Sequence, residues 1–236
     1  MIRNVRAFLV AFAILCGLTL PVLALPKSVI ILRHGEKESV STLCRIGIDR
    51  SLALAAQYLG QGAKDSLFSP GGQPGAFFAI TLETVQHASP AAATWEMPLT
   101  MFSTVPLPGI DPIPQLNLRT QQAAGALMDD PRYDGKTVVM VWNHRHIADK
   151  ALELKFPDQK VTLRQLLNLD KLPDVPDTWL GQTYDYFWIV EFGTSGSRVP
   201  VSFRMERQQF AAPFERLPSS EWGKRAKLPM GSKCLP

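Results

Sequence analysis

The chain has 236 residues, of which 46% are hydrophobic and 19% are charged, a composition typical of a globular protein. This composition excludes a disordered or a collagen-like protein. The 25 basic residues exceed the 21 acidic ones by only four, which gives no electrostatic footprint for nucleic acid, so we expect no nucleic-acid partner.

Residues 1–24 have the features of a signal peptide. A short basic start is followed by an uncharged apolar run over residues 7–20, and small residues up to Ala24 suit a signal peptidase. The apolar run of about 14 residues is shorter than the roughly 20 that cross a bilayer, although an uncleaved anchor is the alternative. We therefore predict export to the periplasm or the medium. Residues 25–236 are expected to form one domain with no stable membrane insertion.

Two cysteines remain once the predicted signal peptide and its Cys16 are removed, namely Cys44 and Cys234. An exported protein lies in a compartment where disulfides persist, so these two can form a bridge between an early loop and the C-terminal tail. Two separate buried thiols are an equal alternative. Because the sequence has no Cys-x-x-Cys motif, redox and zinc-ribbon functions are excluded.

The first half of the mature chain is predicted to contain two strands and two helices before an irregular stretch. A β-branched run predicts a buried central strand over residues 28–32, ended by Arg-His-Gly. Helical spacing follows over residues 48–59, with the predicted inward face formed by Ile48, Leu52, Ala55, Ala56 and Leu59. A brief strand over 66–69 and a helix over 76–87 come next. Residues 88–114 are proline-rich and irregular, apart from a strand near 99–102.

The second half is predicted to begin with a helix over residues 118–128 and a second buried strand over 137–142. A helix then runs through residue 156, and an antiparallel pair covers 184–192 and 199–203. Strands that alternate with helices predict an α/β fold of three layers, with a mostly parallel central sheet and helices on both faces.

Two histidines follow the two strongest strands. His34 comes directly after the first strand, and His144 follows the strand at 137–142. In open α/β sheets, ligands bind outside the carboxyl ends of the strands, so we expect these two histidines in one site.

Three segments around these histidines are similar to motifs of the histidine phosphatase superfamily, which includes phosphoglycerate mutases and acid phosphatases. Ile31-Leu32-Arg33-His34-Gly35-Glu36 resembles its signature. The stretch from Leu43 to Arg50 resembles its Leu-x-x-x-Gly-x-x-Arg segment, and Val138 to His144 resembles the strand that delivers the second catalytic histidine. They occur in family order, and the resemblance covers about residues 27–192.

The resemblance implies a phosphoryl-transfer site. His34 is the implied nucleophile, which becomes a phosphohistidine that water hydrolyses, and a cationic His144 binds the equatorial oxygens. Arg33 and Arg50 hold the phosphoryl group by paired hydrogen bonds, helped by amides near Gly47, while Gly35 leaves room for the phosphate. No metal and no cofactor are expected.

The sequence departs from the family pattern in two places. An arginine usually follows Ser-Pro after the second strand, but Ser69-Pro70 is followed by glycines, so the third phosphate-binding arginine is missing. Thr81, Thr84 or Gln86 could donate hydrogen bonds in its place. The acid phosphatases of the superfamily carry His-Asp where this chain has His144-Arg145. For the acid that protonates the leaving alcohol, Glu83 is therefore the candidate, with Glu96 behind it.

The remaining polar and aromatic candidates have structural interpretations. His146 forms a His-x-His pair with His144, but no third ligand is near in sequence, so we expect no metal site. His87 is interpreted as a surface or capping residue. Glu36 and Glu38 are interpreted as solvated. Four aromatic residues are assigned to the core: Trp142, Tyr184, Tyr186 and Trp188.

These observations predict an exported phosphomonoester hydrolase that acts on a phosphorylated small molecule. Two alternatives remain. One is a catalytically weak or inactive protein of the same fold that binds a phosphorylated or anionic ligand, and the other is an interaction protein that uses residues 90–114. Serine hydrolases are disfavoured because there is no Gly-x-Ser-x-Gly motif, and no nucleotide-binding fingerprint is present. The sequence gives no oligomeric state.

Overall fold

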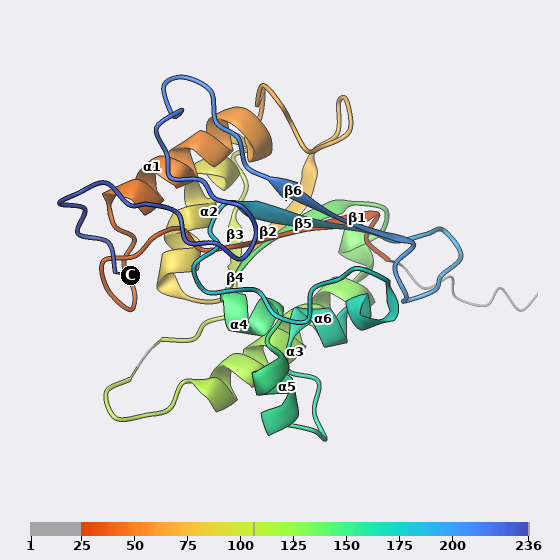
Figure 1. Cartoon of the computed structure of the whole chain (residues 1–236). Coiled ribbons are helices and arrows are strands. Elements are labelled where there is room, and N and C mark those ends of the chain that lie inside the picture. Colours follow the sequence, from red (N-terminus) through yellow and green to blue (C-terminus); the bar gives the residue numbers. More distant parts are fainter. Residues whose placement is uncertain (1–24, 106, 236) are drawn as a thin grey trace, which may run out of the picture.

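A computed structural model describes residues 25–105 and 107–235 (Figure 1). The predicted signal peptide, residues 1–24, lies outside the described residues and stays a prediction. Within the described ranges, no helix is both long enough and apolar enough to cross a lipid bilayer.

The fold is built on one six-stranded sheet in the order β3-β2-β4-β1-β5-β6. The first four strands of the chain pair in parallel, and the last two add antiparallel strands at one edge. This confirms the predicted α/β class with a mostly parallel sheet. The strands are β1 (Ser28–Arg33), β2 (Pro74–Ala79), β3 (Leu99–Met101), β4 (Thr137–Trp142), β5 (Tyr186–Glu191) and β6 (Ser202–Arg207).

Helices cover both faces of the sheet (Figure 1). Side chains of β1 alternate between the two cores: Val29 and Ile31 point to one, and Ile30 and Leu32 to the other. One face is covered by α1 (Arg45–Leu54) and α2 (Leu82–Thr94), and the other by α3 (Ile113–Asp129), α4 (His144–Ile147), α5 (Lys150–Lys155) and α6 (Leu163–Leu166). Single turns complete the chain: a π-turn at Ala55–Leu59 and 3₁₀ turns at Pro131–Tyr133 and Leu169–Lys171.

The sequence-based prediction is wrong for the segment between residues 66 and 94. No strand forms at 66–69, and the predicted helix over 76–87 is instead the strand β2 followed by the start of α2. The aromatic pair Phe77 and Phe78 is fully buried, one on each face of the sheet. The helix then begins after Thr81, whose backbone N–H donates to the Thr84 hydroxyl at 2.8 Å. It continues through Thr94, so the start of the stretch predicted as irregular is helical.

The predicted inward face of the helix that begins as α1 is only partly correct, because Ala55 and Leu59 are buried but the other three predicted residues are exposed. Ile48 and Leu52 are 43% and 44% exposed, whereas Gly47, Arg50 and Ser51 are buried. The buried side chains of α1 also include Ala53 and Leu54, so its inward face is mixed. Its polar part packs against the loop that follows β1, where Arg50 pairs with Glu36. The helix predicted through residue 156 is also divided into two short helices, α4 and α5.

Candidate functional site

The two predicted histidines meet at the carboxyl ends of neighbouring strands. Strands β1 and β4 are paired in parallel with Arg33 opposite Trp142, so the residues that follow each strand emerge side by side. The His34 backbone N–H donates to the Trp142 carbonyl at 3.3 Å. The imidazole centroids of His34 and His144 lie 6.4 Å apart.

Both histidines line a cavity of about 400 Å³, which we call the His34 pocket. Its basic side chains come from two distant segments of the chain, the His34 loop and the C-terminal region. The lining consists of Arg33, His34, Lys37, Asn143, His144, Gly181, Gln182, Tyr184, Arg225 and Leu235. Three of these side chains are permanent cations and none is an acid, so the pocket suits an anion.

His34 is held in the form that a nucleophile needs. Its side chain is 1% exposed, and Nδ1 lies 2.8 Å from the Gly35 carbonyl oxygen. Because a carbonyl only accepts, Nδ1 carries the proton and Nε2 keeps its lone pair. Burial, followed by the charges of Arg33 and Lys37, holds the pKa of His34 well below its usual range. The imidazole is therefore neutral at pH 7.

His144 is also neutral in this environment. Burial, with the charges of Arg33, Lys37 and Arg145, lowers its pKa to about 2. An anionic group in the pocket would offset those charges and favour the imidazolium. The adjoining residue is Gly181, where a Cβ would lie 3.3 Å from His144 Nε2.

Arg33 is oriented by two neighbours from the loop before β5. Its Nη1 donates to the Gly181 carbonyl, and its guanidinium carbon lies 3.8 Å from the centroid of the Tyr184 ring. Burial lowers the pKa of Arg33 to about 10, so it remains charged at neutral pH. Tyr184 was predicted to be a core residue. It lies instead in the pocket wall, under Arg33.

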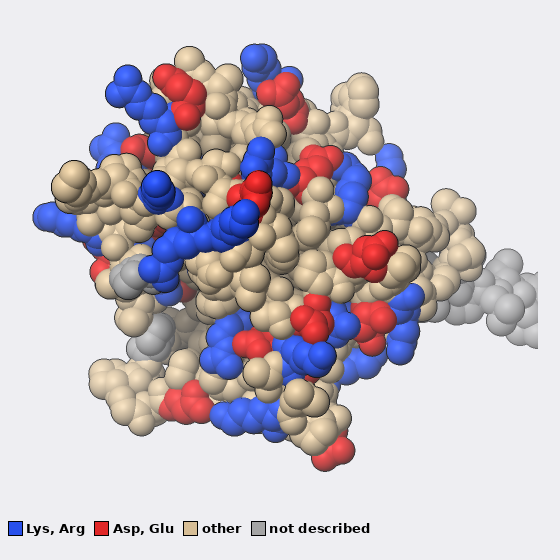
Figure 2. All heavy atoms as spheres, viewed as in Figure 1, with Lys and Arg blue, Asp and Glu red and all other residues tan. Residues whose placement is uncertain are grey.

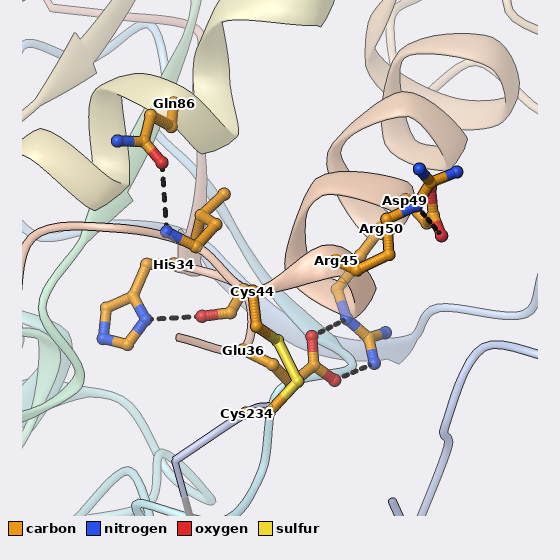
Figure 3. Close-up of a disulfide and its surroundings, with 10 residues drawn as sticks. His34, Glu36, Cys44, Arg45, Asp49, Arg50, Gln86 and Cys234 are labelled. Atoms are coloured by element: carbon orange, nitrogen blue, oxygen red, sulfur yellow. Dashed lines mark hydrogen bonds and ion pairs between the residues drawn. A yellow bond between two sulfur atoms is a disulfide. The ribbon is translucent and has the colours of Figure 1, made fainter. Parts of the chain in front are cut away.

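Arg50 forms a buried ion pair with Glu36 (Figure 3). Its Nη2 and Nε donate to the two carboxylate oxygens at 2.6 and 3.0 Å, and Nη2 also donates to the Pro218 carbonyl at 2.7 Å. Both side chains are 1% exposed, so the interpretation of Glu36 as solvated is wrong. Arg50 does not line the His34 pocket. Its predicted contact with a phosphoryl group stays a prediction, and it would require this pair to open.

Each member of this ion pair keeps the other in its charged form. Burial alone would raise the pKa of the Glu36 carboxyl, but the Arg50 charge and hydrogen bonds outweigh it and the pKa is lowered. Burial alone would lower the pKa of Arg50, and the Glu36 charge raises it. Both groups are therefore ionised at neutral pH.

Close packing requires a glycine at position 35, and the predicted role of Gly35 in leaving room for a phosphate stays a prediction. A Cβ on Gly35 would lie 2.9 Å from the Gly47 Cα and 3.0 Å from the His87 ring. The two glycines thus bring α1 against the His34 loop. His87 fills the space beside them and is 2% exposed, which corrects its interpretation as a surface residue. Burial lowers the pKa of His87 to about 3.

Glu83 lies next to a pocket residue. It is 2% exposed, and its Oε1 is 3.8 Å from Nζ of Lys37. Its Oε2 is buried and has no hydrogen-bond partner among the described residues. Glu96, the second candidate for the proton donor, lies beyond the opposite end of α2 and is exposed.

The proposed replacements for the missing arginine do not line the pocket. Thr81 and Thr84 hydrogen-bond each other at the start of α2, and Gln86 binds the backbone of the loop before α1. Besides Arg33, the positive charges in the pocket lining are those of Lys37 and Arg225. Lys37 could have been noted from its place three residues after His34. Nothing local in the sequence pointed to Arg225.

Of the remaining candidate residues, His146 lies away from the pocket, and the two cysteines connect the C-terminal segment to the loop before α1. His146 Nε2 lies 2.9 Å from Asn117 Oδ1 on α3, and its burial lowers its pKa to about 4. In the described ranges, no three His, Cys, Asp or Glu side chains group as a metal site would require. Cys44 and Cys234, whose pairing the sequence left open, form a disulfide beside the ion pair (Figure 3).

Comparison with known proteins gives likenesses among solved structures only. No family model and no curated protein sequence matches the chain. Among solved structures, it is similar to a protein provisionally named the phosphohistidine phosphatase SixA, from Agrobacterium tumefaciens. The match has a TM-score of 0.34 and 11% identity, and it covers 76% of this chain and 97% of the other. A similarity this weak supports no conclusion about function. The functional argument therefore rests on the site.

Proposed function

We propose that this protein is a phosphomonoester hydrolase with the chemistry of the histidine phosphatase superfamily. The observation that carries the proposal is the state of His34. Its Nδ1 is bound to a carbonyl, its ring is neutral, and it faces a pocket whose permanent charges are all positive. A neutral imidazole beside fixed cations is the arrangement that attack on a phosphate ester requires.

In the proposed reaction, His34 Nε2 attacks phosphorus and forms an N–P bond while the ester P–O bond breaks. The leaving alcohol takes a proton, for which Glu83 is the proposed donor. Water then attacks phosphorus, the N–P bond breaks, and the proton of water returns to Glu83. Arg33 and Lys37 hold the phosphoryl oxygens, and His144 stabilises the charge that develops on them. These side chains supply the positive charge, so the proposal includes no metal.

We also propose that the protein acts outside the cytoplasm. The Cys44–Cys234 disulfide supports this location, because structural disulfides persist in oxidising compartments. The features of residues 1–24 support it independently.

A rapid-quench experiment tests the mechanism. Purified full-length protein is mixed with an aryl phosphate, and both free phosphate and an acid-labile, base-stable phosphoryl adduct are measured. We expect both in the wild type and neither in His34→Ala, because the replacement has no nucleophile. His146→Gln is the matched control, since this histidine faces α3, and it should retain the adduct. Circular dichroism checks that both variants are folded.

One observation favours a second candidate, a protein that binds a phosphorylated ligand without turning it over. The Arg50 guanidinium is fully engaged by Glu36 and its neighbours, which leaves fewer charge-assisted contacts for phosphate. Folded wild-type protein that binds inorganic phosphate in calorimetry, but forms no adduct and releases no phosphate, would support this candidate and overturn the hydrolase.

A further inference from the structure

The C-terminal segment, residues 218–235, returns to the site and is fixed there. Cys234 is bonded to Cys44, just before α1. One residue further, the Leu235 backbone N–H donates to the Lys37 carbonyl at 2.6 Å. Near the start of the segment, the Gly223 N–H donates to the Thr183 hydroxyl at 3.1 Å. The segment is thus tied at both ends to elements that form the His34 pocket.

This segment builds a second cavity of about 480 Å³, which we call the tail cavity. Ala226, Lys227 and Leu228 form one of its walls, and the disulfide residue Cys234 contributes another. The tail cavity shares four lining residues with the His34 pocket: Gln182, Tyr184, Arg225 and Leu235. A molecule with its phosphoryl group at His34 therefore has room for the rest of its body in the tail cavity, whose size suits a small molecule.

The charged side chains of the tail cavity that are not already in an ion pair are positive. Arg225 and Lys227 line it, and the one acid in its lining, Glu36, is neutralised by Arg50. The nearby acid Glu221 is paired with Lys224, which lies outside both cavities. Figure 2 shows basic side chains gathered on the side of the molecule where Figure 1 places the C-terminal chain.

We propose that the tail cavity is a specificity subsite for the alcohol part of the substrate. It selects phosphomonoesters that have a compact, partly apolar body and a second anionic group, which Lys227 and Arg225 bind. This inference rests on the proposed hydrolase function, and it assigns to the tail a recognition role that the reaction itself does not require.

Two aryl phosphates of nearly equal size test the subsite. 4-Carboxyphenyl phosphate has the second anion, and 4-carbamoylphenyl phosphate has a neutral amide in its place. We expect the wild type to show a higher kcat/KM for the carboxylate, by roughly two- to five-fold, which is the size of an exposed ion pair. Lys227→Gln should lower the ratio of the two kcat/KM values toward one, with the remaining preference due to Arg225, and added salt should lower the ratio in the wild type.

The matched control is Lys224→Gln, which removes a neighbouring exposed lysine that lines neither cavity. Its ratio should equal that of the wild type. A wild-type ratio of one, or a ratio that Lys227→Gln leaves unchanged, would overturn the subsite and leave the hydrolase standing. If folded protein hydrolyses neither compound and forms no adduct, the hydrolase proposal fails and the subsite fails with it.

Discussion

At the scale of single residues, the Glu36 carboxylate determines what Arg50 can do. The motif Arg33-His34-Gly35-Glu36 places an acid two residues after the proposed nucleophile, and in the fold this acid turns toward α1. Each of the two buried charges loses its hydration in the fold, and the ion pair compensates for that desolvation cost. Arg50 thus anchors α1 to the His34 loop, and it is Lys37 that lines the pocket.

Removing the charge of Glu36 should therefore destabilise the fold. We expect Glu36→Gln to lower the free energy of unfolding by about 3–5 kcal/mol, because it leaves the Arg50 guanidinium buried without a counter-ion. Urea denaturation measures the change. Asp49→Asn, which breaks an ion pair with the exposed Arg45, is the control and should show no measurable effect. Equal effects of the two substitutions would show that the buried pair does not stabilise the protein.

At the scale of elements, the site depends on how closely α1 approaches the loop after β1. Gly47 lies in the first half of α1, and a Cβ there would be 2.2 Å from the Glu36 carbonyl oxygen. Gly35 faces it from the loop. The approach lets the helix position Arg50 against Glu36. It also explains why Arg50 and Ser51 are buried while the apolar residues Ile48 and Leu52 are exposed.

A methyl group at this contact should force the two elements apart. We expect Gly47→Ala to cost about 1–3 kcal/mol of stability, although alanine is the better helix former, and to reduce phosphoryl transfer by displacing His34. Thermal unfolding and adduct formation measure the two effects. Gly125→Ala in α3 is the matched control, because its Cβ would meet only Asp129 Oδ2 at 3.8 Å. The control should be neutral or more stable by roughly 0.5–1 kcal/mol. A neutral Gly47→Ala would contradict the close approach.

At the scale of the whole molecule, all four histidines of the sequence are held neutral by the fold. His34, His87, His144 and His146 have pKa values lowered, first by burial. In the unfolded chain each would take up a proton near pH 6.5. The unfolded state therefore binds more protons than the folded state below that pH, and stability falls as the pH is lowered.

We expect the free energy of unfolding to decrease between pH 7 and pH 5, by about 2 kcal/mol for each histidine that stays neutral in the fold. The Glu36 carboxyl, whose pKa is lowered, adds a loss in the same direction at still lower pH. Urea denaturation at several pH values measures the dependence. His146→Gln should make it less steep by one proton. A stability that is constant from pH 7 to pH 5 would show that the histidines titrate normally in the folded protein.

The parts of the fold that could be predicted are those set by local pattern. β1 and β4 are buried on both faces, so their apolar runs identify them without knowledge of neighbours, and the histidines that follow them were placed together for the same reason. The segment over residues 66–94 was predicted wrongly. Its strand and its helix follow one another without a clear turn signal, and helical spacing of Phe77, Ile80 and Thr84 crosses the boundary between them.

The sequence by itself determined the α/β class, the two central strands and the positions of Arg33, His34 and His144, because these depend on residues close together in the chain. Only the tertiary structure decided which charges face the pocket. Helix packing turns Arg50 toward Glu36. Arg225 lies in the C-terminal segment, which returns to the pocket and is joined to Cys44 by a disulfide between residues 190 positions apart. Pairings over such distances leave no local pattern, since a buried ion pair and a returning tail are defined by the neighbours that the whole fold brings together.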